Sequence, residues 1–250
     1  MDGMFKEELT GTVKKKRFII LAGLAFAGMA VTAFITKNGK WNDLSYLYAI
    51  YGYLNNYFAL LIGNALILSV YRKKYTNASI MQVEDHSKKR FEGVVVRFLA
   101  GSVIIVCSYV IAAMLAILLG LVLGAHNTIE QTGLMLLKTA LDCVACIAAY
   151  AISLFWLYLF AFPVFPMLIY SILTLGMPFA ITSTNNYWSG AYKLCCYVSP
   201  KVTADYAFTK SIFSNPKPVV IVIFLIQLLI PILLSVIVFN LKKLKPVTGN

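Results

Sequence analysis

The sequence has little charge, and acidic residues are especially scarce. Only 13% of the 250 residues are Asp, Glu, Lys or Arg, against about 25% in an ordinary soluble domain. Just 10 residues are acidic, while hydrophobic residues make up 60% of the chain and the mean hydropathy is +0.79. No aqueous core can absorb this much apolar sequence. The composition therefore excludes an ordinary soluble protein and indicates that the bilayer is the solvent.

Common catalytic and metal-binding motifs are also missing. The His-Glu-x-x-His and Gly-x-Ser-x-Gly patterns and the Walker phosphate loop do not occur. His86 and His126 lie on opposite sides of the expected membrane, so we predict no metal site. The Cys143-x-x-Cys146 pair has no second pair beside it, and we interpret both thiols as small packing residues. We expect a chain that is not an enzyme and binds no cofactor itself.

Long apolar runs dominate the sequence instead. They approach 20 residues, the length at which a helix crosses a hydrocarbon core of about 30 Å, and they lack the alternation of barrel strands. They predict an all-α integral membrane protein with six transmembrane helices in one domain, 1–250. The expected spans are 18–36, 44–71, 94–124, 136–160, 164–182 and 219–240. Near the end of the third span, Gly120-x-x-x-Gly124 is expected to allow close helix contact.

Lys and Arg are distributed unevenly around these spans. Of the 22 basic residues, 15 lie on the side that holds both chain ends and seven lie on the other side. Because cytoplasmic segments keep an excess of Lys and Arg, this asymmetry predicts that both termini are cytoplasmic. The net charge of +12 then reflects topology and anionic lipid, and no nucleic-acid partner is expected. We expect an amphipathic surface helix in 1–17 and an exposed external loop in 185–217.

The connection between spans two and three has a distinctive layout. It contains the segment Thr76 to Val83, whose apolar residues Ile80 and Met81 suit a groove on a partner, and then Arg97-Phe98-Leu99 at the start of span three. This layout resembles permease subunits of ATP-binding cassette (ABC) exporters with the type-two fold, in which a coupling helix at this place docks on the ATPase. The six spans, the tight turn between spans four and five and the external loop before span six are also similar to that family, over the whole chain.

The resemblance implies a function and partners. The chain is expected to be the membrane permease subunit of an ATP-driven exporter, to form a homodimer or a heterodimer with a similar permease, and to bind a separate ATPase that holds ATP and Mg. The implied cargo is an amphipathic or hydrophobic compound, such as an antimicrobial peptide or a drug, and the implied location is a bacterial plasma membrane. The residues expected to couple to the ATPase are Thr76, Ser79, Ile80, Met81, Val83, Glu84, Asp85 and Arg97. A turn that dips into lipid headgroups is the alternative for Thr76 to Val83.

Polar residues within the expected spans form a second group of candidates. In an ideal helix Tyr46, Tyr53, Tyr57 and Asn64 share one face, with Asn56 beside them, and amides are costly against lipid. Asp142 is the one acid inside an expected span, near its outer boundary. The predicted substrate path comprises Tyr53, Asn56, Tyr57, Asn64, Asp142 and Gln227. The alternatives are interhelical hydrogen bonds of the asparagines and a local ion pair of Asp142 with Lys138, one turn away.

Two other functions are compatible with a membrane protein of this size. A secondary transporter driven by an ion gradient would need internal repeats or unwound helices with ion ligands near the middle of the membrane. An intramembrane enzyme would need a nucleophile with a base, or a paired acid and metal site, and Asp142 alone does not provide either.

Overall fold

The computed structural model of this chain is helical throughout its described part. It describes residues 2–38, 46, 49, 50, 52–70, 87–125, 128–159, 169, 199–201, 203, 204 and 218–241. The elements within these residues are α1 (Asp2–Val13), α2 (Lys16–Asn38), the π-helical segment η1 (Leu54–Phe58), α4 (Ala59–Val70), α6 (Ser87–Leu123), α7 (Ile129–Leu159) and α11 (Pro218–Leu241). The all-helical fold expected from the sequence is confirmed.

Three of these helices are long and apolar enough to cross a membrane, as expected for a membrane protein. The apolar stretches are Lys16–Thr36 in α2, Phe91–Leu123 in α6 and Ile129–Trp156 in α7. Shorter apolar stretches are Ala59–Ser69 in α4 and Val222–Val238 in α11. The expected first, third, fourth and sixth spans thus fall on α2, α6, α7 and α11, and the second falls on η1 and α4. The expected fifth span, 164–182, lies outside the described residues except for Ile169.

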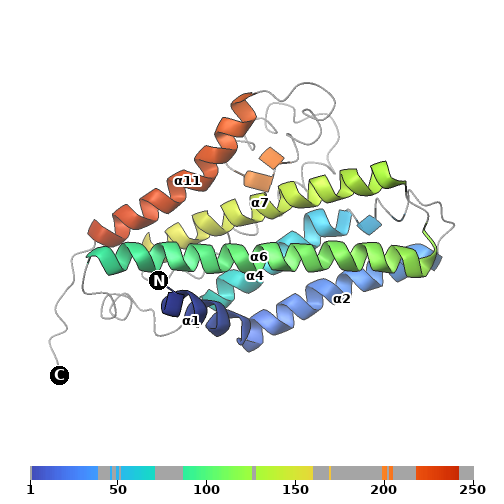
Figure 1. Cartoon of the computed structure of the whole chain (residues 1–250), viewed down its shortest axis with the longest axis horizontal. Helices are drawn as coiled ribbons and strands as arrows, with labels where there is room; N and C mark the ends of the chain where they lie inside the picture. The colour runs from blue at the N-terminus through green and yellow to red at the C-terminus, as the bar shows by residue number, and fades with distance from the viewer. Residues whose placement is uncertain are drawn as a thin grey trace.

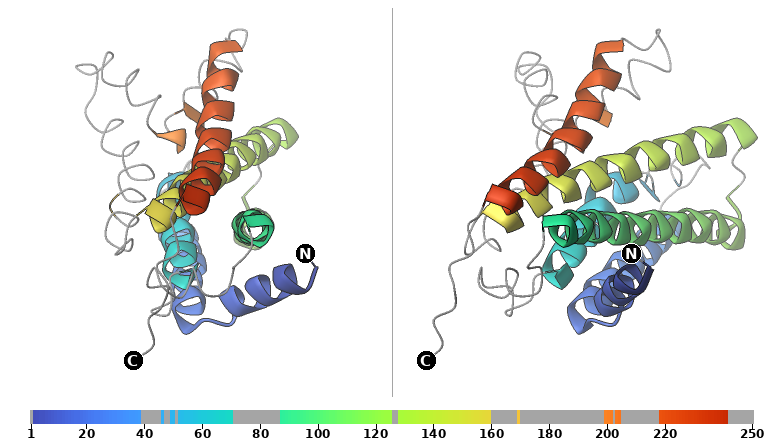
Figure 2. Two further views of the ribbon diagram at one scale, coloured as in Figure 1. Left: turned by 90° about the vertical axis from the view of Figure 1, so that its left-hand side faces the viewer. Right: turned by 60° about the vertical axis from the view of Figure 1, so that its left-hand side comes forward.

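The helices form a bundle around α7. Helices α6 and α7 pack against each other in opposite directions, α4 packs against both α2 and α7, and α11 crosses α7 and leans away from it (Figure 1). In the left view of Figure 2, α6 is seen end-on while α1 lies across that direction. Helix α1 packs against α6, where Glu8 of α1 meets Arg97 near the amino-terminal end of α6.

The ends of α6 and α7 are fixed by local capping motifs. Helix α6 is followed by Gly124, whose φ of 76° lies in the left-handed region. The N–H of Gly124 donates to Leu121 O at 3.1 Å, and the N–H of Ala125 donates to Gly120 O at 2.9 Å. These two bonds define a Schellman motif, which glycine favours because it has no Cβ. Helix α7 begins with a capping box, in which Thr128 and Gln131 exchange side-chain and backbone bonds of 3.1 and 3.2 Å.

Both caps change an expectation. We expected 126–132 to be a polar connection and span four to begin at 136, but the capping box starts the helix at Ile129. We also expected Gly120 and Gly124 to form one close-packing surface. That prediction is wrong for Gly124, which ends the helix and has no atom within 4 Å of an added Cβ, whereas Gly120 does contact a neighbouring side chain.

Tyrosine side chains seated against glycines join the helices at three places. Each tyrosine ring lies where a glycine Cβ would otherwise stand, namely Tyr46 on Gly120, Tyr53 on Gly28 and Tyr150 on Gly101. Each hydroxyl then donates to a carbonyl three or four residues before that glycine, on the same helix. The acceptors are Ala116 O at 2.6 Å for Tyr46, Ala25 O at 2.5 Å for Tyr53 and Arg97 O at 3.3 Å for Tyr150. We call these contacts Tyr–Gly notches.

The Tyr–Gly notches form because glycine has no side chain. A missing side chain lets an aromatic ring lie directly on the helix backbone, where its hydroxyl reaches a carbonyl that is already bonded within the helix. Each notch therefore buries a large ring and satisfies its only polar group. Tyr46 thus contacts α6, whereas Tyr53, seven residues later, contacts α2.

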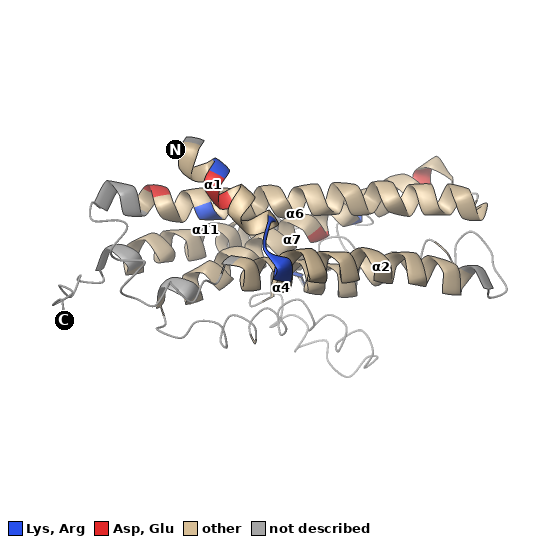
Figure 3. Cartoon of the chain, turned by 90° about the horizontal axis from the view of Figure 1, so that it is seen from below, with Lys and Arg blue, Asp and Glu red and all other residues tan. Residues whose placement is uncertain are grey.

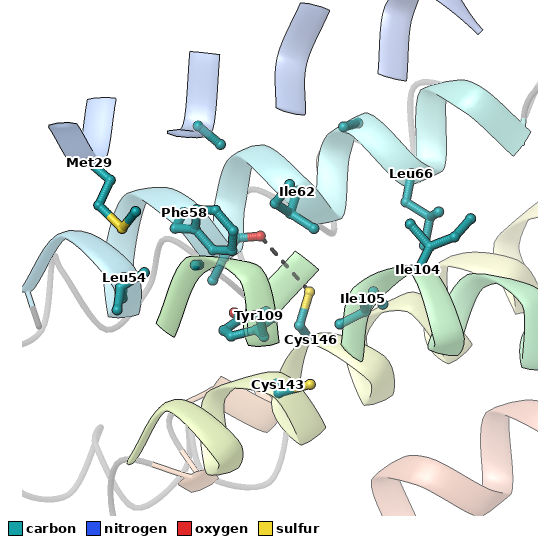
Figure 4. Packing of buried hydrophobic residues seen from close by; sticks show 14 of the residues in the cluster. Met29, Leu54, Phe58, Ile62, Leu66, Ile104, Ile105, Tyr109, Cys143 and Cys146 are labelled. Atoms are coloured by element: carbon teal, nitrogen blue, oxygen red, sulfur yellow. Dashed lines mark hydrogen bonds between the residues drawn. The ribbon is translucent and has the colours of Figure 1, made fainter. Parts of the chain in front are cut away.

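The core lies where α2, α4, α6 and α7 meet. Phe58 is fully buried and makes edge-to-face contacts with Phe26 and Tyr109, at ring-centre distances of 5.3 and 5.4 Å. Ile62, Leu66 and Ile105 continue the packing along α4 and α6, and the thiol of Cys146 donates to Ala59 O at 3.9 Å (Figure 4). The reading of Cys143 and Cys146 as packing residues agrees with this geometry, since both are buried and unbridged.

The outward faces of the long helices are apolar. Figure 3 shows long stretches of α2, α6 and α7 without charged residues. Exposed large side chains include Ile20, Leu24 and Phe34 of α2, Val106, Val110 and Met114 of α6, and Leu225, Leu229 and Leu233 of α11. A soluble domain would bury side chains of this kind, whereas hydrocarbon solvates them.

Candidate functional site

A buried cluster of charges is centred on Asp142 of α7. Its Oδ1 atom accepts from Lys138 Nζ at 2.6 Å and from Lys201 Nζ at 2.5 Å. The side chains of Asp142 and Lys201 are completely buried, and that of Lys138 is 3% exposed. Bonds between ionised groups are short and strong, and burial removes the screening that water would supply. We call Lys138, Asp142 and Lys201 the charge cluster.

The charge cluster lies in the middle of the membrane-length helix. Asp142 comes 13 residues after Ile129 and 14 before Trp156, the ends of the apolar stretch of α7. At 1.5 Å per residue, about 20 Å of helix lies on either side. Asp142 is thus midway along this apolar stretch, because α7 starts seven residues earlier than expected, while its place near the outer boundary of the membrane stays a prediction. A buried charge is costly unless it is paired, which accounts for the two short contacts.

Lys201 reaches Asp142 from a part of the chain that we expected to be an exposed loop. Within 185–217 the structure describes Ser199, Pro200, Lys201, Thr203 and Ala204, and all of them are buried. Thr203 N–H bonds Ser199 O at 3.1 Å, so these residues form a helical turn, which we call the buried turn. It lies between α7 and α11 (Figure 1). The expectation of an exposed loop is wrong for these five residues.

The buried turn also contacts α11. Gln227 is 6% exposed, and its Oε1 accepts from Thr203 Oγ1 at 3.2 Å. Gln227 stands nine residues after the start of α11 at Pro218, well inside the helix. Thus two of the six residues predicted for the substrate path, Asp142 and Gln227, contact the same turn from opposite helices. The structure brings these two together through Lys201 and Thr203, which the prediction did not include.

Tyr109 adds an unsatisfied polar group on the facing helix, α6. Its ring lies beside Cys146 and Cys143, the residue next to Asp142 (Figure 4). The side chain is 2% exposed, and its hydroxyl has no hydrogen-bond partner in the described part of the chain. Buried hydroxyls are nearly always bonded to protein or water. Tyr109 therefore contributes a polar group that the described residues leave unsatisfied, beside the helix turn that holds Asp142.

The path residues expected in span two separate into packing and exposed positions. Tyr53 is 8% exposed and occupies the notch on α2, while Tyr57 is 50% exposed and stacks on Tyr53 with ring centres 6.0 Å apart. Asn64 donates to Leu60 O at 2.9 Å within its own helix, and its Oδ1 has no described partner. The backbone of Asn56 lies in η1, and its side chain is outside the described residues.

The π-helical segment η1 explains why the expected stripe is divided. A π turn is wider than an α turn and shifts the helical phase of every residue that follows it. The face calculated at 100° per residue therefore does not continue through Leu54–Phe58. Such turns are rare and occur frequently at functional sites, so η1 is itself a candidate feature of the site.

Of the residues expected to couple to an ATPase, Arg97 is the one that the structure describes. Its guanidinium is 3.7 Å from Glu8 of α1, and both side chains are largely buried. Nearby, Lys15 Nζ donates to Ser69 O, which fixes the corner between α1 and α2 to the end of α4. Thr76, Ser79, Ile80, Met81, Val83, Glu84 and Asp85 lie outside the described residues.

No metal site is apparent among the residues that the structure describes, since no three of His, Cys, Asp and Glu lie together there.

The sequence signals for Lys201 and Tyr109 were weak, because neither follows a local pattern. A lysine flanked by Pro200 and Val202 is an ordinary loop sequence, and only the tertiary fold brings it to Asp142. No protein-family model matches the chain, and a search of the curated proteins finds no match.

Proposed function

We propose that this chain is the membrane permease subunit of an ATP-driven ABC exporter, located in a bacterial plasma membrane. The supporting observation is the start of α6. This helix begins at Ser87, two residues after Asp85, and continues unbroken for 37 residues. The segment that resembles a coupling helix therefore leads directly into a helix longer than the bilayer is thick.

The contacts near Arg97 support the same proposal. A partner that displaces the segment before Ser87 also moves Arg97, and with it Glu8 of α1 and the carbonyl that binds Tyr150 of α7. A displacement at the amino-terminal end of α6 is then transmitted to α7, the helix that contains Asp142. We further propose that two such permeases dimerise, that a separate ATPase supplies ATP hydrolysis, and that the cargo is an amphipathic or hydrophobic compound such as an antimicrobial peptide or a drug.

Copurification tests this function. The full chain, extracted in mild detergent from its native membrane, should retain an ATPase subunit, and Ile80→Asp with Met81→Asp should release it. Met4→Asp makes the same kind of exchange on α1, where Met4 is 39% exposed, and should not affect retention. Recovery of the unaltered chain without any nucleotide-hydrolysing partner would contradict the proposal.

A secondary transporter driven by an ion gradient is the second candidate, and the charge cluster favours it. Ionisable residues at mid-membrane often belong to proton relays, and interrupted helices near the midplane often carry the ion sites of such transporters. Asp142, the buried turn and η1 together have that character. Transport that persists after ATP depletion but stops when the proton gradient is collapsed would favour this candidate over the exporter.

A further inference from the structure

Two ammonium groups share a single oxygen atom in the charge cluster. Lys138 and Lys201 both donate to Asp142 Oδ1, so two like charges stand next to each other around one acceptor. They differ in origin. Lys138 is on α7, one turn from Asp142, and moves with it; Lys201 belongs to the buried turn, 59 residues further along the chain.

This difference decides what happens if the buried turn moves away. In an isolated buried pair, loss of the lysine leaves an uncompensated carboxylate, which is strongly unfavourable. Here Lys138 remains on the same oxygen, so Asp142 stays paired after Lys201 leaves. Another ammonium entering the vacated position restores the original contacts and the original total charge. An anion would instead have to displace a carboxylate held by two lysines.

The surroundings of the charge cluster suit a cation attached to an apolar body. Tyr109 presents a buried hydroxyl with no described partner, and its ring packs edge-to-face on Phe58. Aromatic rings and hydroxyl oxygens are common partners of ammonium groups in desolvated sites. Apolar side chains of the core, such as Ile105, lie close to the ring of Tyr109 (Figure 4).

We propose that Lys201 is an internal occupant of a cation subsite at Asp142, and that the ammonium group of a cationic amphipathic substrate replaces it there. The inference rests on the proposed transport function, and it narrows the cargo to molecules with a protonated primary amine and an apolar body. Displacement of Lys201 breaks the ion pair that joins the buried turn to Asp142 of α7, so substrate binding should loosen this turn.

Thiol labelling on the buried turn tests the exchange directly. The full chain, with its five native cysteines replaced and Thr203→Cys added as a reporter, is placed in lipid nanodiscs without nucleotide or ATPase. The probe is hexylammonium, with hexan-1-ol as the uncharged control. Thr203 is 1% exposed, so labelling by N-ethylmaleimide should be slow without a ligand. Hexylammonium should raise the labelling rate about 5-fold or more, since 5-fold is the lower end of typical coupling between two sites.

Three variants give the test its specificity. Asp142→Asn should label quickly without hexylammonium and should not respond to it. Lys201→Met should behave in the same way, and it serves as a second readout if Asp142→Asn fails to fold, as judged by gel filtration. Glu130→Gln alters an exposed acid on the same helix and should label like the parent chain.

The outcomes separate this inference from the proposed function. A labelling rate that hexylammonium does not change, or that hexan-1-ol raises equally, overturns the cation subsite even if an ATPase copurifies with the chain. A specific response to hexylammonium upholds the subsite even if no ATPase is found, in which case the exporter alone is rejected.

Discussion

Replacing Gly101 by Ala tests the notch between α6 and α7. An added Cβ would overlap the ring of Tyr150 and stand 2.7 Å from its hydroxyl oxygen. Tyr150 is 2% exposed, so the ring has no free space to enter. Either the two helices separate locally or Tyr150 adopts another rotamer and loses its bond to Arg97 O.

The size of the effect follows from three opposing contributions. Overpacking in a filled core costs about 1–3 kcal/mol. Loss of the hydroxyl bond costs about 0.5–1.5 kcal/mol. Alanine regains about 1 kcal/mol because it favours helix over glycine. The free energy of unfolding should therefore fall by about 0.5–3.5 kcal/mol, so steric overlap outweighs helix propensity.

The assay is reversible unfolding in mixed micelles of increasing SDS content, followed by circular dichroism. Gly133→Ala is the matched control, because Gly133 is also helical but has no atom within 4 Å of an added Cβ, and it should stabilise the fold by up to about 1 kcal/mol. Combining Gly101→Ala with Tyr150→Leu should recover part of the loss, since the ring that overlaps is gone. Equal effects of Gly101→Ala and Gly133→Ala would refute the notch as a source of stability.

Three further predictions concern other contacts. Asp142→Asn leaves two buried ammonium groups without their shared carboxylate and should destabilise the chain by about 3–5 kcal/mol, whereas Lys138→Ala should cost less because Lys201 still pairs with Asp142; SDS unfolding compares them. Thr128→Ala removes the capping box of α7 and should cost about 0.5–2 kcal/mol, and an unchanged midpoint of thermal unfolding would contradict the role of that cap. Glu8→Gln removes the negative charge from a largely buried pair with Arg97, 3.7 Å away, and should cost about 1–3 kcal/mol; unchanged stability would mean that this contact does not fix α1 to α6.

Sequence reasoning predicted the elements that depend on local composition. The apolar runs located α2, α6, α7 and α11 to within seven residues at each end, because the length and composition of a membrane helix are properties of one segment. The start of α7 could have been placed more accurately. Thr128 and Gln131 have the spacing of a capping box, and this signal outweighs the polarity that made 126–132 look like a connection.

The charge cluster could be predicted only in part. The Lys138–Asp142 contact follows from helix periodicity, since residues four apart share a face. Lys201 could not be found in this way, because its position depends on how the buried turn folds back against α7. Likewise, nothing in Leu54–Phe58 marks a π turn, and the identity of each Tyr–Gly pair depends on which helices meet.

The buried turn also constrains the order in which the protein is made. Asp142 is synthesised 59 residues before Lys201, so α7 can occupy the bilayer with Lys138 as its internal counter-ion before the second lysine exists. Lys201 reaches Asp142 only by docking against a helix that has already been made. Docking of the buried turn is therefore a late step of biogenesis, and in chains in which it fails the Lys201 ammonium would lack its contact with Asp142 and would be open to membrane quality control.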